Sequence, residues 1–441
     1  MPKPISNNVF GVDGVNLVKD PLKLTLSEAT QLQNAELLMD EATGGAAALK
    51  MRGGLAALNG SALASTVLGV FGWPLRTTYT RTIYAARQTE DSNTFKTSSA
   101  GTSWADSALP SAAAAEAKFA DEDNSRTQRR LRAYRSFVLY AGNGYTKGTD
   151  DPILTLWDGT NAFTVTSIKY GPSSNGSVPF AITDVYVANG LLYLAIHDQG
   201  GTAPNLSGRV VSVNLDTGQV KQIANSFGSG TGEVAGGAPA CLYFYKGELF
   251  VGLNTGNTTN GIGKIVRCFP GVDTTWTADV SNLVQGVTSM VAFKGDLYAT
   301  TRSSASAAEV ITRRAATGTT WATVDTGVGS AGNGHYAHLT VHESALYAVD
   351  YHATAPTIHI RTSTDGTSWS TSRDVDSSDG GAAGNLPGGS LSYNSALYFV
   401  FRSTTATATD GFIMRFASAA WTKIDTDNYL GPIGVLTQRT A

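Results

Sequence analysis

The sequence predicts an all-β fold, a seven-bladed β-propeller of four-stranded blades, because two short patterns recur along most of it. The first pattern is an apolar strand, a two-residue turn and a second apolar strand. A large apolar or aromatic residue stands three positions after each turn. Successive copies are 48 to 57 residues apart, which is typical of propeller blades and longer than a solenoid coil. In chain order the aligned residues are Tyr84, Leu139, Tyr193, Phe250, Tyr298, Tyr347 and Tyr398.

Each of these turns is expected to join the first two strands of a blade. Asn189-Gly190 is the clearest turn, because both residues of a tight hairpin turn need positive φ, which Asn and Gly adopt readily. The other expected turns are Thr80-Arg81, Arg135-Ser136, Lys246-Gly247, Lys294-Gly295, Glu343-Ser344 and Asn394-Ser395.

The second pattern follows about twenty residues later and predicts the third and fourth strands. It is an apolar strand, a turn rich in Gly or Asp, and then usually a Trp, which should pack between neighbouring blades because one four-stranded sheet cannot bury both of its faces. A string of small sandwiches is the other arrangement of repeated strands, but seven of them need far more chain. The aligned residues are Trp104, Phe163, Val220, Trp276, Trp321, Trp369 and Trp421.

The chain ends are expected to close the ring. Residues 433–436 form an extra apolar strand, and its expected partner is the first blade. Either terminus could supply the innermost strand. Cys241 is expected on a first strand and Cys268 on a third strand, too far apart for a disulfide, so both thiols should be free.

Composition excludes several classes of function. The chain has 441 residues, a formal net charge of −3 and only 15% charged residues, so we expect no sequence-specific nucleic-acid partner. No run approaches 18 apolar residues, so we expect no membrane insertion, and the first residues lack a secretory pattern. No nucleotide-binding loop or zinc-type spacing occurs, and we expect no cofactor, no metal and no catalytic residue.

Residues 1–65 differ in composition from the predicted propeller, residues 66–441. Thr25 and Glu28 fit a capping box that starts a short helix, with an apolar side formed by Leu26, Ala29, Leu32 and Leu37. Such a helix is too short to be stable alone, so the segment should dock on a propeller face, a neighbouring subunit or another protein.

The stretch "NLVKDPLKLTLSEATQLQNAELLMDEATGGAAALKMRGGL" resembles the N-terminal segment of certain tailed-phage virion proteins. The resemblance implies a non-enzymatic tail component of the nozzle or hub type, made in the host cytoplasm and present in the virion. It also implies a symmetric ring of copies, a hexamer, with portal, adaptor or tail proteins as partners. The assembly-interface candidates are Asp20, Pro21, Leu22, Glu28, Asn34, Arg52, Gly53 and Gly54. The alternative is a carbohydrate- or receptor-binding, or glycosidase-like, propeller of a tail or secreted protein.

Three features could carry chemistry on a propeller. If the strands pair regularly, His335 lies opposite His352, and two such imidazoles could hold a transition metal; polar residues at a strand end are the alternative. The stretch "STDGTSW", residues 363–369, resembles the Asp-box of sialidases and related propellers, which is a structural turn. A sialidase-type site also needs an arginine cluster on inner strands. The arginines available for one fall instead at edge or third-strand positions: Arg313, Arg314, Arg361, Arg402 and Arg415.

One run of charge, residues 121–135, precedes the second blade. Arg129, Arg130 and Arg132 could form an intersubunit ion-pair patch or touch passing DNA. The alternative is a solvated loop that enters the blade, which is the usual meaning of a charge run.

Overall fold

A computed structural model gives the fold of the chain, which divides into two compact units, Met1–Leu75 and Arg76–Ala441. The structure describes residues 35–39, 47–51, 78–88, 93–108, 131–134, 137–142, 153–159, 162–165, 179–198, 207–227, 237–254, 263–283, 286–303, 307–327, 334–352, 358–375, 386–402, 411–427 and 429–440.

The first unit contains one described element, a hairpin of β1 (Ala35–Met39) and β2 (Ala47–Met51). Leu37 pairs with Leu49 in this hairpin, so the prediction that Leu37 belongs to a helix is wrong. The Ala, Leu and Met of β1 favour helix, but cross-strand pairing overrides so weak a preference. The predicted helical positions 25–34, and all eight assembly-interface candidates, lie outside the described residues.

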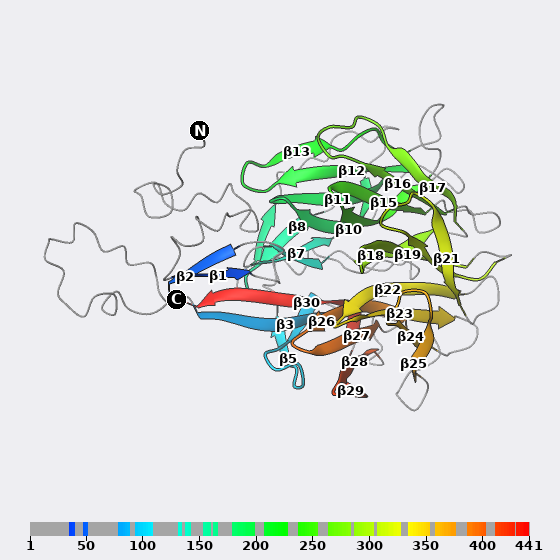
Figure 1. The fold of residues 1–441 in the computed structure, drawn as a ribbon. Helices are drawn as coiled ribbons and strands as arrows, with labels where there is room; N and C mark the ends of the chain where they lie inside the picture. The colour runs from blue at the N-terminus through cyan, green and yellow to red at the C-terminus, as the bar shows by residue number, and fades with distance from the viewer. Residues whose placement is uncertain are drawn as a thin grey trace, which may run out of the picture. The chain divides into compact units, whose positions relative to one another are not determined.

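The second unit is a β-propeller, as predicted (Figure 1). Its described residues form seven four-stranded antiparallel sheets and no helix. In sheet order, the first contains β30 (Tyr429–Thr440), β3 (Thr78–Gln88), β4 (Asn93–Ser98) and β5 (Ala105–Ala108), and the second β6 (Leu131–Tyr134), β7 (Phe137–Gly142), β8 (Ile153–Trp157) and β9 (Ala162–Val165). The third contains β10 (Pro179–Ala188), β11 (Leu191–Asp198), β12 (Ser207–Asn214) and β13 (Gln219–Gln222), and the fourth β14 (Ala238–Tyr245), β15 (Glu248–Asn254), β16 (Gly263–Cys268) and β17 (Thr277–Leu283). The fifth contains β18 (Val287–Phe293), β19 (Asp296–Thr301), β20 (Val310–Arg314) and β21 (Trp321–Thr326), and the sixth β22 (Gly334–His342), β23 (Ala345–His352), β24 (Ile358–Ser363) and β25 (Ser370–Val375). The seventh contains β26 (Leu386–Tyr393), β27 (Ala396–Arg402), β28 (Gly411–Ala417) and β29 (Ala420–Asp427).

The first strand of each sheet contacts the first strands of its two neighbours, in the order β6, β10, β14, β18, β22, β26, β30 and back to β6. These inner strands therefore form a closed ring. The sheets are called blades 1 to 7 below. Buried side chains gather mainly between adjacent blades; one cluster joins Tyr193 and Val210 of blade 3 to Leu242 and Val251 of blade 4.

Among the described residues, no helix has the length and hydropathy of a membrane span.

The aligned residues of the first pattern all lie on second strands, so the predicted blade phase is confirmed. The five described turns have positive φ at their first residue, from 49° at Lys294 to 52° at Asn189 and Lys246. Arg135-Ser136 lies outside the described residues. Thr80-Arg81 is not a turn, because both residues lie inside β3 and the first strand of blade 1 comes from the other end of the chain.

The C-terminal strand β30 is the innermost strand of blade 1. It pairs with β3 from Thr78 opposite Thr440 to Arg87 opposite Tyr429. The chain thus closes the ring by pairing its last strand with the first strand of the second unit, which removes the open sheet edges of a linear array. In Figure 1 these two strands run side by side, β30 in red and β3 in blue.

The aromatic residues of the second pattern stand at the start of, or on, fourth strands, and three tryptophans hydrogen-bond to the preceding blade. Trp276 is 6% exposed, stacks on Phe227 with ring centroids 5.2 Å apart and donates its Nε1–H to the Asn225 carbonyl at 2.8 Å. The Trp321 indole donates to Asp279 and that of Trp421 to Ser372. These bonds join blades 4, 5 and 7 to the blades before them.

Trp369 is less buried than its place in the pattern suggests. It packs against the cluster between blades 5 and 6 but is only half-buried. Cys241 on β14 and Cys268 on β16 are both free and buried, as the strand assignment requires. Burial raises the pKa of the Cys268 thiol to about 12.

Candidate functional site

A β-bulge recurs on the inner strands near the point where each strand begins. The pairing of first and second strands shifts at Thr183 in blade 3, at Ala240 in blade 4 and at Thr288 in blade 5. Similar shifts occur in blades 6 and 7. We call this side of the ring the loop edge, and the side with the two-residue turns the turn edge. A bulge turns one extra residue out of the regular ladder, and bulges are common beside binding sites.

The bulges and the residues after them join neighbouring inner strands. The Thr183 hydroxyl donates to the Pro239 carbonyl of the next blade, and the Asp184 carboxylate accepts the Leu242 N–H at 2.7 Å. Asp184 also accepts the N–H of Val185 at 2.8 Å. These bonds fix the start of each inner strand relative to its neighbour.

The same arrangement repeats between blades 5 and 6. There the Thr288 hydroxyl donates to the Tyr336 carbonyl, and the Ser289 hydroxyl accepts the Leu339 N–H at 3.1 Å. At the loop edge, side-chain to main-chain bonds therefore join blade 3 to blade 4 and blade 5 to blade 6.

A solvent-open recess lies at the loop edge, where β10, β14 and β18 begin and β15 and β19 end. All three bulged residues line it, so the bulges shape its wall. Its described lining residues are Thr183, Ala238, Pro239, Ala240, Asn254, Gly286, Val287, Thr288 and Arg302.

Asn254 and Arg302 both contact Gly286 on the rim of the recess, Asn254 through its side chain and Arg302 through its main chain. The main-chain N–H of Arg302 donates to the Gly286 carbonyl at 3.2 Å. A Cβ added to Gly286 would lie 3.0 Å from the amide oxygen and Cγ of Asn254, so the Asn254 side chain rests directly on the glycine. Glycine here leaves room for the Asn254 amide on the rim of the recess.

The recess offers groups that can bind a polar ligand. Its described lining residues do not include a pair of carboxyl groups for acid–base catalysis. No Asp or Glu is among the described lining residues, whereas glycoside hydrolysis ordinarily needs two carboxyl groups. The amide, the guanidinium and nearby main-chain carbonyls can instead hydrogen-bond a polar ligand against the small apolar walls of Ala238, Pro239 and Val287. Sequence reasoning missed this site, because its signal is a one-residue bulge rather than a motif.

The Asp-box-like turn is formed at the turn edge of blade 6. The Asp365 carboxylate accepts the N–H groups of Thr367 and Ser368, each at 2.7 Å, and the two bonds hold the pKa of Asp365 below its usual range. Gly366 has φ +81°, and a Cβ there would lie 2.0 Å from the Tyr298 hydroxyl of blade 5. The turn is structural, as the resemblance implies.

A related turn occurs in blade 1. There the Gly101 N–H donates to the Ser98 hydroxyl at 2.8 Å, as the Gly366 N–H does to Ser363 in blade 6. Gly101 also has positive φ and faces a tyrosine hydroxyl of the preceding blade, that of Tyr398. The glycine of the turn in one blade thus contacts the tyrosine on the second strand of the preceding blade.

The predicted pairing of two histidines is wrong by one residue. His335 lies opposite Tyr351, and His352 lies opposite Gly334. The shift arises at the bulge between Ala337 and Thr340, which regular counting back from the turn ignores. Within the described residues, no group of three His, Cys, Asp or Glu side chains could hold a metal ion.

The remaining candidate residues do not gather at the recess. Four of the arginines lie on third strands, as predicted, whereas the prediction is wrong for Arg402, which ends the second strand β27. Arg132 lies on the inner strand β6, whereas Arg129 and Arg130 lie outside the described residues.

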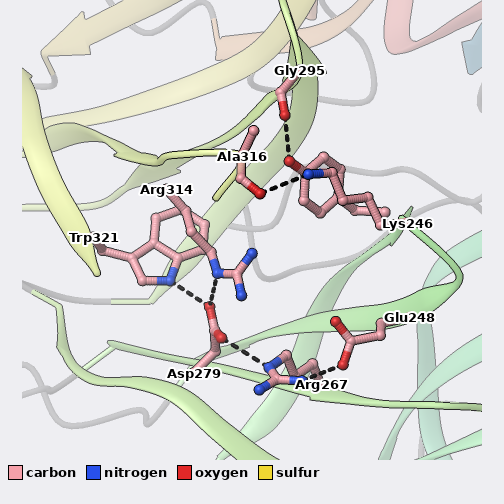
Figure 2. A network of polar contacts seen from close by, with 9 residues as sticks. Lys246, Glu248, Arg267, Asp279, Gly295, Arg314, Ala316 and Trp321 are labelled. Atoms are coloured by element: carbon pink, nitrogen blue, oxygen red, sulfur yellow. Dashed lines mark hydrogen bonds and ion pairs between the residues drawn. The ribbon is translucent and has the colours of Figure 1, made fainter. Parts of the chain in front are cut away.

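Several of these arginines tie blades together. Figure 2 shows Asp279 of blade 4, whose carboxylate is 1% exposed, between two arginines. Arg267 of the same blade binds it at 2.9 Å and Arg314 of blade 5 at 3.0 Å, while the Trp321 indole donates to it at 2.6 Å. Glu248 binds the other side of Arg267. The network is part of the contact between blades 4 and 5.

His342 offers a test of blade packing by pH. Its Nδ1 lies 2.9 Å from the Ser392 hydroxyl of blade 7, and the rings of Tyr347 and Phe416 are each 6.2 Å from the imidazole. Burial lowers the pKa of His342, although the nearby Glu343 carboxylate acts in the opposite direction. The folded state therefore keeps this histidine neutral where the unfolded chain already binds a proton.

We therefore expect the contribution of His342 to stability to be complete above about pH 6.5, the ordinary histidine pKa, and to be lost as pH falls below it. Urea unfolding should show that lowering the pH from 7.5 to 5.5 reduces the free energy of unfolding less in His342→Gln than in the unchanged chain. The same substitution at His359, on the outer part of blade 6, is the control. An equal loss of unfolding free energy in all three proteins would contradict the inference that folding keeps His342 neutral.

Comparisons with known proteins identify no family for this chain. No protein-family profile matches the chain. No curated protein matches it either. Among solved structures, the GH74 xyloglucanase of Xanthomonas campestris has a TM-score of 0.49 and 11% identity, over 76% of this chain and 50% of that one. A prolyl endopeptidase has a TM-score of 0.45 and 11% identity, over 81% of this chain and 50% of that one. The Trypanosoma rangeli sialidase has a TM-score of 0.40 and 13% identity, over 77% of this chain and 56% of that one.

The resemblance to tailed-phage virion proteins is not supported, and the predictions of a non-enzymatic phage tail component drawn from it are wrong. The similar structures named here are enzymes with propellers, and none is a phage protein. The chain spans about half the length of these proteins, and at such identities the likeness shows the fold alone. The ring of copies and the portal, adaptor and tail partners stay predictions of that resemblance.

Proposed function

We propose that this chain is a carbohydrate-binding propeller with a glycosidase-like body, which holds a saccharide in the recess at the loop edge. The observation that carries the proposal is the recess itself. Repeated bulges place Thr183, Ala240 and Thr288 in its wall, and Gly286 leaves room for the Asn254 amide on its rim.

The chemistry of the recess suits a sugar. A saccharide presents many hydroxyl groups, each both a donor and an acceptor, and the site offers an amide, a guanidinium and main-chain carbonyls. The small apolar walls accommodate the C–H faces of a sugar ring. The Asp-box-like turn of blade 6 favours the same class, because it resembles the structural turns of sialidases and related propellers.

The test is a binding titration of the whole chain against a panel of neutral and acidic oligosaccharides. Asn254→Ala should weaken the binding of the best saccharide about 3- to 10-fold, the effect of one hydrogen bond. The same substitution at Asn214 is the control, because that side chain caps the β12–β13 turn at the turn edge. New reducing ends in the same mixtures would reveal hydrolysis. Binding to no saccharide, or binding unaffected by Asn254→Ala, would refute the proposal.

A further inference from the structure

We infer that the propeller opens locally at two of its blade interfaces, between blades 5 and 6 and between blades 7 and 1. Two features of these interfaces carry the inference: the tryptophan of the second sequence pattern, and a bulge in the strand that it meets in the preceding blade. Opening of this kind does not depend on the proposed function, because the described lining residues of the recess lie on or beside strands of blades 3, 4 and 5.

A bulge recurs in the fourth strands of blades 4 to 7. In blade 4 the pairing of β16 with β17 skips Asp279, and in blade 6 the pairing of β24 with β25 skips Ser372. Val324 of blade 5 and Ile424 of blade 7 are skipped in the same way. Each skipped residue directly precedes the partner of a third-strand isoleucine, so the four bulges stand at matching positions.

At two interfaces the skipped residue is polar and bonds the indole of the next blade. The Trp321 Nε1–H of blade 5 donates to the Asp279 carboxylate at 2.6 Å. The Trp421 Nε1–H of blade 7 donates to the Ser372 hydroxyl at 3.0 Å. The bulge therefore brings an acceptor to the tryptophan between blades 4 and 5 and between blades 6 and 7.

At the other two interfaces the skipped residue is apolar and cannot accept a hydrogen bond. Val324 and Trp369 pack in one cluster between blades 5 and 6, and Ile424 and Trp104 pack in another between blades 7 and 1. The Nε1 atoms of both tryptophans are buried, and neither has a hydrogen-bond partner among the described residues.

A buried N–H without a partner favours opening of the interface that covers it. When the interface opens, the N–H gains a hydrogen bond to water, whereas an N–H that is already bonded gains nothing. Opening therefore costs less free energy at these two interfaces than at the two with a polar bulge. Blades 6 and 7 lie between the two weak interfaces and stay joined by the bond from Trp421 to Ser372, so they can move as one unit.

Ion pairs hold the same two interfaces closed. Arg361 of blade 6 binds Asp325 of blade 5 at 3.1 Å. Lys96 of blade 1 binds Asp425 and Asp427 of blade 7 at 2.9 Å and 2.8 Å. These side chains are between 12% and 21% exposed, so dissolved salt reaches them and screens their attraction. Opening should therefore increase as salt is added.

The experiment measures, by NMR, how fast the indole N–H groups exchange with solvent in the whole chain carrying isotope-labelled tryptophan. The N–H groups of Trp104 and Trp369 should exchange about 10-fold faster than those of Trp321 and Trp421, and the ratio should grow as salt is added. All four side chains are half-buried, so they form a matched set. The signals are assigned by their loss in four single variants: Trp104→Phe, Trp321→Phe, Trp369→Phe and Trp421→Phe.

Two opposite substitutions test the role of the bulged residue. Val324→Ser supplies a hydroxyl, as in blade 6, and should slow the exchange of Trp369 while Trp104 of the same molecule stays unchanged. Ser372→Val removes the acceptor and should speed the exchange of Trp421. Equal exchange of the four indoles in the unchanged chain would overturn the inference. Fast exchange that does not respond to salt, or a Trp369 rate unaffected by Val324→Ser, would overturn it as well.

Discussion

Removal of residues 429–441 is expected to prevent the propeller from closing. This deletion removes the whole of β30, the innermost strand of blade 1 and the strand that contacts both β26 and β6. The edge of β3 would then be bare, and buried residues of blade 1, such as Ile83 and Ala85, would lose their covering strand. We expect loss of the cooperative thermal transition rather than a modest shift of its midpoint.

Circular dichroism on heating and gel filtration of the truncated chain would measure this. A synthetic peptide of residues 429–440 should restore the transition when added in excess, and a peptide with the same residues in scrambled order should not. A truncated chain with an unchanged melting temperature would show that β30 is not the closing strand.

Substitution of Asp279 should have the largest effect of any single change at a blade interface. Its carboxylate is 1% exposed and binds Arg267, Arg314 and the Trp321 indole at once. Asp279→Ala leaves two cations and an N–H without this partner, and loss of one member of a buried ion-pair network costs about 3–5 kcal/mol.

Urea unfolding of Asp279→Ala, measured against Asp279→Asn, tests this. Asparagine keeps the shape and one acceptor, so it should cost less than alanine. The matched control is Asp296→Ala, because Asp296 binds Arg313 of the same blade at a more exposed site. Asp279→Ala with a cost no greater than that control would contradict the role of the network.

The blades could be predicted from the sequence because their signals are local. The Lys246-Gly247 and Lys294-Gly295 turns need positive φ at both residues, which few sequences allow, so the turns mark the phase of every strand pair around them. Tyr298 and Tyr398 stand at matching positions because each meets the glycine of a turn in the next blade.

Closure and the candidate site could not be predicted because they depend on pairing between distant parts of the chain. Thr80-Arg81 looked like a turn, although the partner of β3 lies more than 340 residues away along the sequence. The bulges at Thr183 and Thr288 change no residue type that a pattern search recognises, yet they shape the recess. The same kind of irregularity displaced His335 from its expected partner.

The central claim is that the recess between the starts of β10, β14 and β18 is the ligand site. A crystal of the whole chain, soaked with the saccharide that binds best in the titrations, tests it most directly. Difference density for the sugar should lie in the recess within hydrogen-bond distance of the Asn254 amide. Density for the sugar at the turn edge, or elsewhere on the ring with the recess empty, would contradict the account.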